Sequence, residues 1–241
     1  VSTSRHLEDR QGHDVVVTGM GAITPAGRGV EATWRGALAG IATATHDERL
    51  AAAGATMAIS CRAPDVDIDA ELGRGSVRRL DRFTHLAVIA AREAIAQAGL
   101  VDGADPDVIV AVDADRTGVV IGTGIGGGES WETEYARLTA EGPTRVSPLF
   151  VPRMLSNTAA GTIAIRTHAR GPNLTVNTAC AAGASAIHVG RDMIRSGTAD
   201  VVIAGGVEAG ITTIAISAFA QMGALSSNPD PLAASRPFDV A

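Results

Sequence analysis

The chain has 241 residues, of which 46% are hydrophobic, so it is long and apolar enough to form a substantial core. Its formal net charge of −6 argues against general binding to nucleic acids, which is done by basic surfaces. Its two cysteines form neither a disulfide framework nor a CxxC zinc motif. No apolar stretch approaches the roughly 20 residues of a membrane span, and the polar residues 1–14 do not form a signal peptide. We therefore expect a protein of the reducing cytoplasm.

Runs rich in Val and Ile alternate with helix-compatible stretches along the chain. In chain order, the sequence predicts strands within 14–27, 115–128, 174–180 and 199–209. It predicts helices within 29–41, 78–100, 129–142, 147–173, 181–197 and 211–225. Residues 51–76 are mixed and turn-rich, which indicates surface loops. This order predicts an α/β fold with a parallel or mixed sheet covered by helices on both faces.

The second predicted strand ends in a glycine loop. Gly122, Gly124 and Gly127 satisfy G-x-G-x-x-G, a pattern found in dinucleotide sites. The next segment, however, begins with Glu129 and Glu132, whose charges repel phosphate, and no acid-ending second strand follows. The other interpretation is that these glycines let the backbone pass close to something bulky.

Cys180 lies where the third predicted strand, "LTVNTAC", meets the next predicted helix. A sharp turn there exposes the residue, and the unpaired N–H groups and dipole of a helix start favour the thiolate, which is the nucleophilic form. The same N–H groups could stabilise an oxyanion. A buried structural thiol remains the alternative, and it is the interpretation that fits Cys61, in its turn-rich stretch.

No general base is evident near this cysteine. His188 lies about 12 Å further along the helix, His85 is expected to cap a helix or lie at the surface, and His168 has no evident partner. No cluster of residues has the spacing of metal ligands.

Together these motifs resemble the β-ketoacyl-acyl-carrier-protein synthases, the condensing enzymes of the thiolase-like superfamily, and most closely the synthase II type. The resemblance runs from about Val15 to Asp239 through nine ordered landmarks: "VVVTGMGAITPAG", "RRLDRFTHLAVIAAREA", "GVVIGTGIGGG", "GPTRVSPLFVP", "NTAAG", "RGPN", "NTACAAGASAI", "GTADVVIAGGVEA" and "ALSSNPDPLAASRPFD". It implies a thiolase-like fold in which residues 15–241, after a polar leader of residues 1–14, form the N-terminal half of a layered αβαβα architecture.

The resemblance implies that Cys180 takes an acyl group from a thioester, with its backbone N–H in the oxyanion hole. The acyl-cysteine then condenses with malonyl-acyl-carrier protein to give 3-oxoacyl-acyl-carrier protein, in fatty-acid or polyketide synthesis, without a cofactor. Ile125, Phe150 and Phe219 match positions that line or gate the acyl pocket. For Phe150 and Phe219, ordinary core packing is an equally open interpretation.

The resemblance also implies partners. Arg74, Arg78 and Arg79 match residues that dock an acidic acyl carrier protein, although a solvated helix start would explain them equally well. One departure weakens the docking assignment: many relatives carry an arginine within the stretch that matches "FAQMGAL", whereas this chain has Gly223. A homodimer or a ketosynthase-like heterodimer is implied for the full-length protein.

Relatives continue beyond "SRPFD" with a second half that carries two catalytic histidines and a lysine. We therefore expect that this chain alone does not complete the condensation. Two alternatives stay open: a non-catalytic partner like the chain-length factors, which lack the cysteine, and a nucleotide-binding oxidoreductase.

Overall fold

The computed structural model describes residues 14–239, so most of the predicted polar leader lies outside the described residues. At its centre is a three-stranded parallel sheet in the order β6 (Asn173–Val176), β5 (Thr117–Gly122) and β7 (Val201–Gly206). All six residues of β5 are buried, as expected for a Val/Ile-rich strand with neighbours on both sides. Three of the four predicted strands are therefore confirmed.

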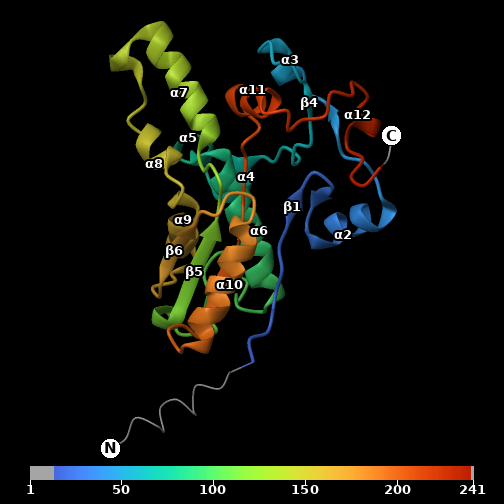
Figure 1. Cartoon of the computed structure of the whole chain (residues 1–241). Coiled ribbons are helices and arrows are strands. Elements are labelled where there is room, and N and C mark those ends of the chain that lie inside the picture. The colour runs from blue at the N-terminus through green and yellow to red at the C-terminus, as the bar shows by residue number, and fades with distance from the viewer. Residues whose placement is uncertain (1–13, 240–241) are drawn as a thin grey trace, which may run out of the picture.

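Helices cover both faces of this sheet (Figure 1). α10 (Ala182–Arg195) packs against β5 and β7, whereas α9 (Thr158–Thr167) and α6 (Arg82–Gln97) pack together on the opposite face. Side chains alternate along β5, so that Val119 and Ile121 enter the core cluster of α6 and α9 and Val120 faces α10. Small residues let these layers approach closely, and the α/β prediction is confirmed.

The first predicted strand is wrong. Residues 14–22 run along α6 without a ladder, and only β1 (Ile23–Thr24) and β2 (Gly27–Arg28) pair, as a short antiparallel ribbon before α2 (Val30–Ala39). Side chains of α6 take the place of ladder partners, since the backbone N–H of Ala22 donates to Glu93 at 2.9 Å. The valine-rich run led to the prediction of a strand, but a strand also requires a neighbouring strand with which its backbone can form hydrogen bonds.

Residues 51–76 contain more regular structure than predicted. A second ribbon joins β3 (Thr45–His46) and β4 (Ile59–Ser60), and the short helices of this region are α3 (Glu48–Ala52), α4 (Ile68–Leu72) and α5 (Ser76–Arg79). Asp47 and Asp67 cap α3 and α4 through their carboxylates, which is a short-range signal that helix periodicity does not detect.

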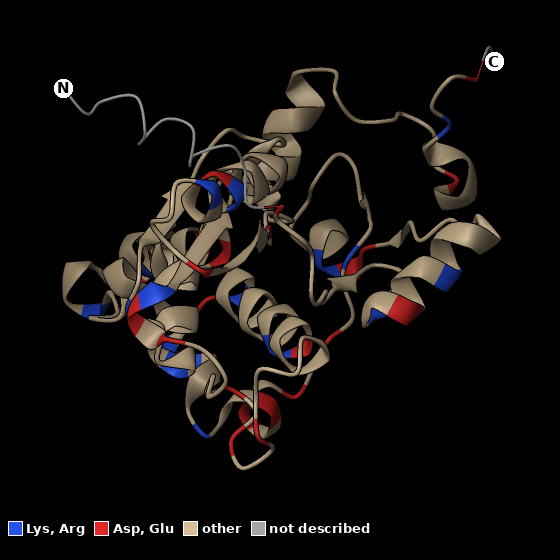
Figure 2. Ribbon diagram, turned by 90° about the horizontal axis from the view of Figure 1, so that it is seen from below, with Lys and Arg blue, Asp and Glu red and all other residues tan. Residues whose placement is uncertain are grey.

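Four further helices complete the described chain: α7 (Gly128–Glu141), α8 (Phe150–Met154), α11 (Thr213–Gln221) and α12 (Pro231–Ala234). Two 3₁₀ turns accompany them, η1 (Ala114–Arg116) just before β5 and η2 (Pro143–Arg145) after α7. α7 and α8 form an arm that extends beyond the sheet (Figure 1). In Figure 2, acidic and basic residues are scattered over many elements. No helix of the described residues is long and apolar enough to cross a membrane.

Candidate active site

Cys180 sits in a sharp turn between β6 and α10. The preceding residue, Ala179, has a positive φ of 50°, a left-handed conformation that costs a non-glycine residue about 1 kcal/mol or more. The turn is closed by hydrogen bonds from the N–H of Ala181 to the carbonyl of Thr178 and from that of Ala182 to Ala179. Cys180 is exposed at the apex, so the structure shows a solvent-accessible thiol rather than a buried structural one.

Glycines bring the start of α10 directly onto the ends of β5 and β7. A Cβ atom on Gly122 would lie 2.1 Å from the carbonyl oxygen of Ala182, and one on Gly206 would lie 2.6 Å from the Cα of Gly183. Neither distance is sterically allowed, so these positions require glycine. The backbone that follows Cys180 is thereby held close to the sheet.

The Cys180 thiol opens onto a pocket of about 720 Å³. The walls are mainly apolar and come from segments far apart in the sequence, including Ile23, Leu86, Ile125, Val207, Ile216 and Phe219. Arg62, Glu129 and Glu208 are among its polar lining residues. An apolar cavity with a few charged groups and a thiol at its edge suits a ligand with an alkyl chain and a reactive head.

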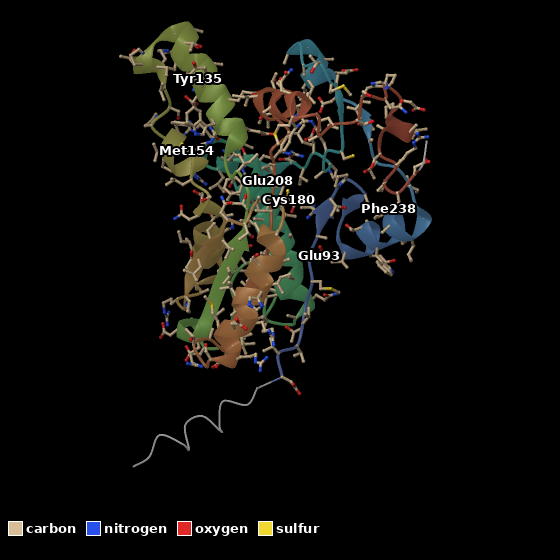
Figure 3. The ribbon with its side chains drawn as sticks, viewed as in Figure 1. Glu93, Tyr135, Met154, Cys180, Glu208 and Phe238 are labelled. Atoms are coloured by element: carbon tan, nitrogen blue, oxygen red, sulfur yellow. The ribbon has the colours of Figure 1, made fainter. Side chains whose placement is uncertain are left out.

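Glu208, just after β7, holds the glycine loop beside Cys180 (Figure 3). Its carboxylate accepts hydrogen bonds from the backbone N–H groups of Gly124 (2.8 Å) and Ile125 (3.1 Å), and from the Thr123 hydroxyl at 3.4 Å. On the other side, the amide of Asn177 donates to the carbonyl of Gly124 at 3.1 Å. Because a carboxylate already occupies these N–H groups, the loop does not present them to a nucleotide phosphate.

Arg62 connects two carboxylates with different environments. It binds Asp47, and its Nη1 lies 3.9 Å from the Glu129 carboxylate at the pocket wall. Burial raises the pKa of Glu129, and the nearby Asp81 carboxylate adds to the rise. For Asp47, burial acts in the same direction but is outweighed by hydrogen bonds from Ser60 and Arg62, which lower its pKa to about 2.

The structure brings together some of the predicted site residues. Ile125 and Phe219 line the same pocket as Cys180. Phe150 is not among the lining residues; it lies at the start of α8 with its ring edge-on to Trp131, at a centroid distance of 5.8 Å. Phe150 is half-buried and is not part of the core cluster either, so the structure places it in neither the pocket wall nor the core.

The three predicted docking arginines lie on and just before α5. Arg74, Arg78 and Arg79 are all exposed, and the guanidinium of Arg79 donates to the backbone carbonyl of Arg74 at 3.2 Å. Within residues 14–239, none of the three forms an ion pair with a carboxylate. Their positive charge is therefore open to a partner.

Two expectations about single residues are wrong. Cys61, interpreted as structural, is exposed and lines the Cys180 pocket. His85, expected at a cap or at the surface, is buried in α6 with its Nε2 3.1 Å from the carbonyl oxygen of Ser76, and burial lowers its pKa. The sequence also missed Glu208, because the N–H groups that it binds lie more than 80 residues away in the chain. It missed Arg62 as well, which binds Asp47 and lies beside Glu129 without belonging to a recognisable motif.

The pocket residues offer no histidine, and among the described residues no group of three or more histidine, cysteine or acidic side chains could hold a metal ion. The chemistry available at this site from residues 14–239 is that of the thiol, the N–H groups around it and the charged wall.

Several known proteins are similar to this chain in sequence or in fold. The 3-oxoacyl-[acyl-carrier-protein] synthase 2 of Staphylococcus aureus (strain COL) is 40% identical over 228 residues, which cover 95% of this chain and 53% of that protein. The ishigamide ketosynthase/chain length factor is 32% identical, with a TM-score of 0.72 over 89% of this chain and 57% of that one. A ketosynthase solved with its type II polyketide-synthase acyl carrier protein and a hexaketide is 25% identical, with a TM-score of 0.74 over 95% of this chain and 54% of that one.

The chain thus spans about half the length of the curated relatives it matches. Residues 12–241 match the family model described as the N-terminal domain of β-ketoacyl synthase. The thiolase-like ketosynthase fold, the cysteine turn and this match agree, and the chain belongs to the β-ketoacyl synthase family.

Proposed function

We propose that Cys180 accepts an acyl group from an acyl-carrier thioester as the first half of a carbon–carbon bond-forming reaction. The observation that carries this proposal is the exposed thiol at a strained turn that opens onto an apolar pocket. In the whole protein, the acyl-cysteine condenses with malonyl-acyl-carrier protein to give 3-oxoacyl-acyl-carrier protein, in fatty-acid or polyketide synthesis. Residues 15–241 act as its N-terminal ketosynthase domain, in the cytoplasm.

The transfer is a thioester exchange. The Cys180 thiolate attacks the carbonyl carbon, a new carbon–sulfur bond forms, and the bond to the carrier sulfur breaks, so that the carrier leaves as a thiol after taking a proton. The N–H of Cys180 donates to no acceptor within residues 14–239 and is free to bind the oxyanion. Ile125 and Phe219 are the described residues that we assign to the wall around the acyl chain.

Intact-mass spectrometry tests the acyl transfer. The chain is incubated with an acyl-carrier thioester and compared with the Cys180→Ala variant, while a Cys61→Ser variant controls for the second thiol in the pocket. We expect one acyl adduct that depends on Cys180 and persists in Cys61→Ser. A folded chain that gains no such adduct contradicts the proposal.

We expect no 3-oxoacyl product when malonyl-carrier thioester is added to the 241-residue chain alone. No histidine lines the pocket within the described residues, so nothing there stabilises the carbanion that forms when malonyl loses carbon dioxide. Detection of 3-oxoacyl-carrier product by mass spectrometry would refute this expectation.

Arg74, Arg78 and Arg79 are proposed as the docking site for the acidic carrier protein. Their exposure and their lack of carboxylate partners within residues 14–239 support this assignment. Charge reversal in Arg78→Glu/Arg79→Glu should weaken carrier binding about tenfold and reduce its salt dependence. Arg195→Glu, a reversal of an exposed arginine at the far end of α10, is the matched control, and equal losses in both variants contradict the assignment.

The cysteine favours an enzyme over the chain-length-factor-like alternative, and Glu208 on the glycine loop disfavours the nucleotide-binding one. For the full-length protein we propose a homodimer or a heterodimer with a second ketosynthase-like chain.

A further inference from the structure

The glycine loop beside Cys180 is tied down from two directions. Glu208 fixes the N–H groups of Gly124 and Ile125, while Asn177, from the turn before the nucleophile, fixes the carbonyl of Gly124. Hydrogen bonds to an ionised carboxylate are about twice as strong as those between neutral groups. The two peptide groups that flank Gly124 therefore have a fixed orientation, and with them the direction of the Ile125 side chain.

The Ile125 side chain is 49% exposed and lies between two backbone segments. A Cβ atom on Gly210 would lie 3.0 Å from Ile125 Cδ1, and one on Gly128 would lie 3.2 Å from Ile125 Cγ2. The side chain is thus flanked by backbone on both sides, at the start of α7 and after β7. Its position in the pocket wall follows from where Glu208 holds its backbone.

We propose that Glu208 is a positioning residue that limits the length of the alkyl chain accepted beside Cys180, by holding Ile125 in the pocket wall. The inference deepens the proposed acyl transfer and rests on it for the identity of the natural substrate. Without the Glu208 carboxylate, the loop loses the hydrogen bonds from the N–H groups of Gly124 and Ile125. The Ile125 side chain can then move out of the pocket wall, and longer alkyl chains fit.

Glu208 also lines the pocket itself, so its removal alone could simply enlarge the cavity. A double-mutant cycle with Ile125 separates the two effects. If Glu208 acts through Ile125, Glu208→Ala adds nothing once Ile125 is already alanine. If it acts only by filling space, the two changes add.

The readout is alkylation of Cys180 by N-alkylmaleimides in a Cys61→Ser background, followed by intact-mass spectrometry. The measured quantity is the ratio of the rate constants for N-decylmaleimide and N-ethylmaleimide, so that changes in thiol reactivity common to both reagents cancel. We expect Glu208→Ala and Ile125→Ala each to raise this ratio about tenfold, and the double variant to raise it no further.

Glu93 provides the matched control. Its carboxylate also accepts hydrogen bonds from two backbone N–H groups, those of Ala22 and Val30, at 2.9 Å each. Glu93, however, lies on α6 and does not line the pocket. Glu93→Ala should lower stability without changing the ratio. If Glu208→Ala does not fold, Glu208→Asp, one methylene shorter, takes its place in the cycle.

An unchanged ratio in the Glu208 variants, or additive changes in the cycle, overturns the positioning role. Alkylation needs no acyl thioester, so the two proposals fail separately. If the cycle is non-additive but the chain never forms an acyl adduct, the positioning role is supported and the acyl-transfer function is contradicted. If the chain is acylated but the changes are additive, the acyl-transfer function is supported and the positioning role is contradicted.

Discussion

Glu129 is a carboxyl group whose environment opposes its own ionisation. Burial raises its pKa above the ordinary 4.5, and the Asp81 carboxylate adds to the rise, so the folded chain keeps this proton to higher pH than the unfolded chain does. Its contribution to stability therefore falls as pH increases from below 4.5 through the raised pKa.

Replacing Glu129 by glutamine should increase the free energy of unfolding at pH 7, because the amide cannot ionise. We expect a gain of at most about 1 kcal/mol, since the exposed part of the side chain is screened by water. Urea denaturation of both chains at several pH values measures the difference, which should vanish below pH 4.5. A difference that is constant with pH would point to packing rather than to titration.

Individual site residues were predictable to different degrees. The strand–turn–helix pattern predicts an exposed Cys180, and the family resemblance assigns Ile125 to the acyl pocket. The structure places both residues at one pocket. Glu208 was not predicted, because its role depends on β7 lying beside β5, which no local pattern reveals. The positive φ of Ala179 was equally hidden, since alanine gives no signal for a left-handed turn.

At the scale of elements, the position of Cys180 depends on how α10 meets the sheet. A methyl group on Gly122 would overlap the carbonyl oxygen of Ala182, so Gly122→Ala must push the first turn of α10 away from β5. We expect the free energy of unfolding to fall by about 1–3 kcal/mol, as for other overpacked sites. Alkylation of Cys180 should also slow, because the turn is displaced.

Gly161 in α9 is the matched control for this change. A Cβ atom there meets no other atom within 4 Å. Because alanine is favoured over glycine inside a helix, Gly161→Ala should raise the free energy of unfolding by about 0.5–1 kcal/mol. Thermal unfolding and the rate of alkylation are measured on both variants. Equal effects on stability would mean that the close contact between Gly122 and α10 is not maintained in solution.

Helices were predicted better than strands or short elements. α2, α6, α9, α10 and α11 fall within the predicted ranges, and α7 begins one residue before its range, since each helix is long enough for its periodicity to be detected. The ribbons and helices of residues 45–79 escaped prediction because they are two to five residues long. These short elements depend on tertiary contacts such as the ion pair between Arg62 and Asp47.

At the scale of the whole molecule, the α7–α8 arm exposes a row of large apolar side chains. Trp131, Tyr135 and Leu138 follow one another at helical spacing along α7, and Val151 and Leu155, in and just after α8, are also exposed. Tyr135 is 57% exposed and projects from α7 in Figure 3. Such a surface suits the proposed dimer, because aromatic residues dominate protein interfaces.

We expect concentration-dependent dimerisation in sedimentation equilibrium and a dimer at least tenfold weaker in Tyr135→Asp. Ala136→Asp, which places the same charge one position along the helix, should have a smaller effect because it lies beside the row. If the parent chain stays monomeric at every concentration, this surface has another role.

The central place of β5 makes its amides reporters of ligand binding. Its backbone is paired with a strand on each side, so its N–H groups reach deuterated solvent only when the sheet comes apart. A ligand that binds only the folded chain slows this exchange by the factor 1 + [L]/Kd. Hydrogen–deuterium exchange in the peptide that contains Val119–Ile121 would therefore measure occupancy of the Cys180 pocket without any label on the cysteine.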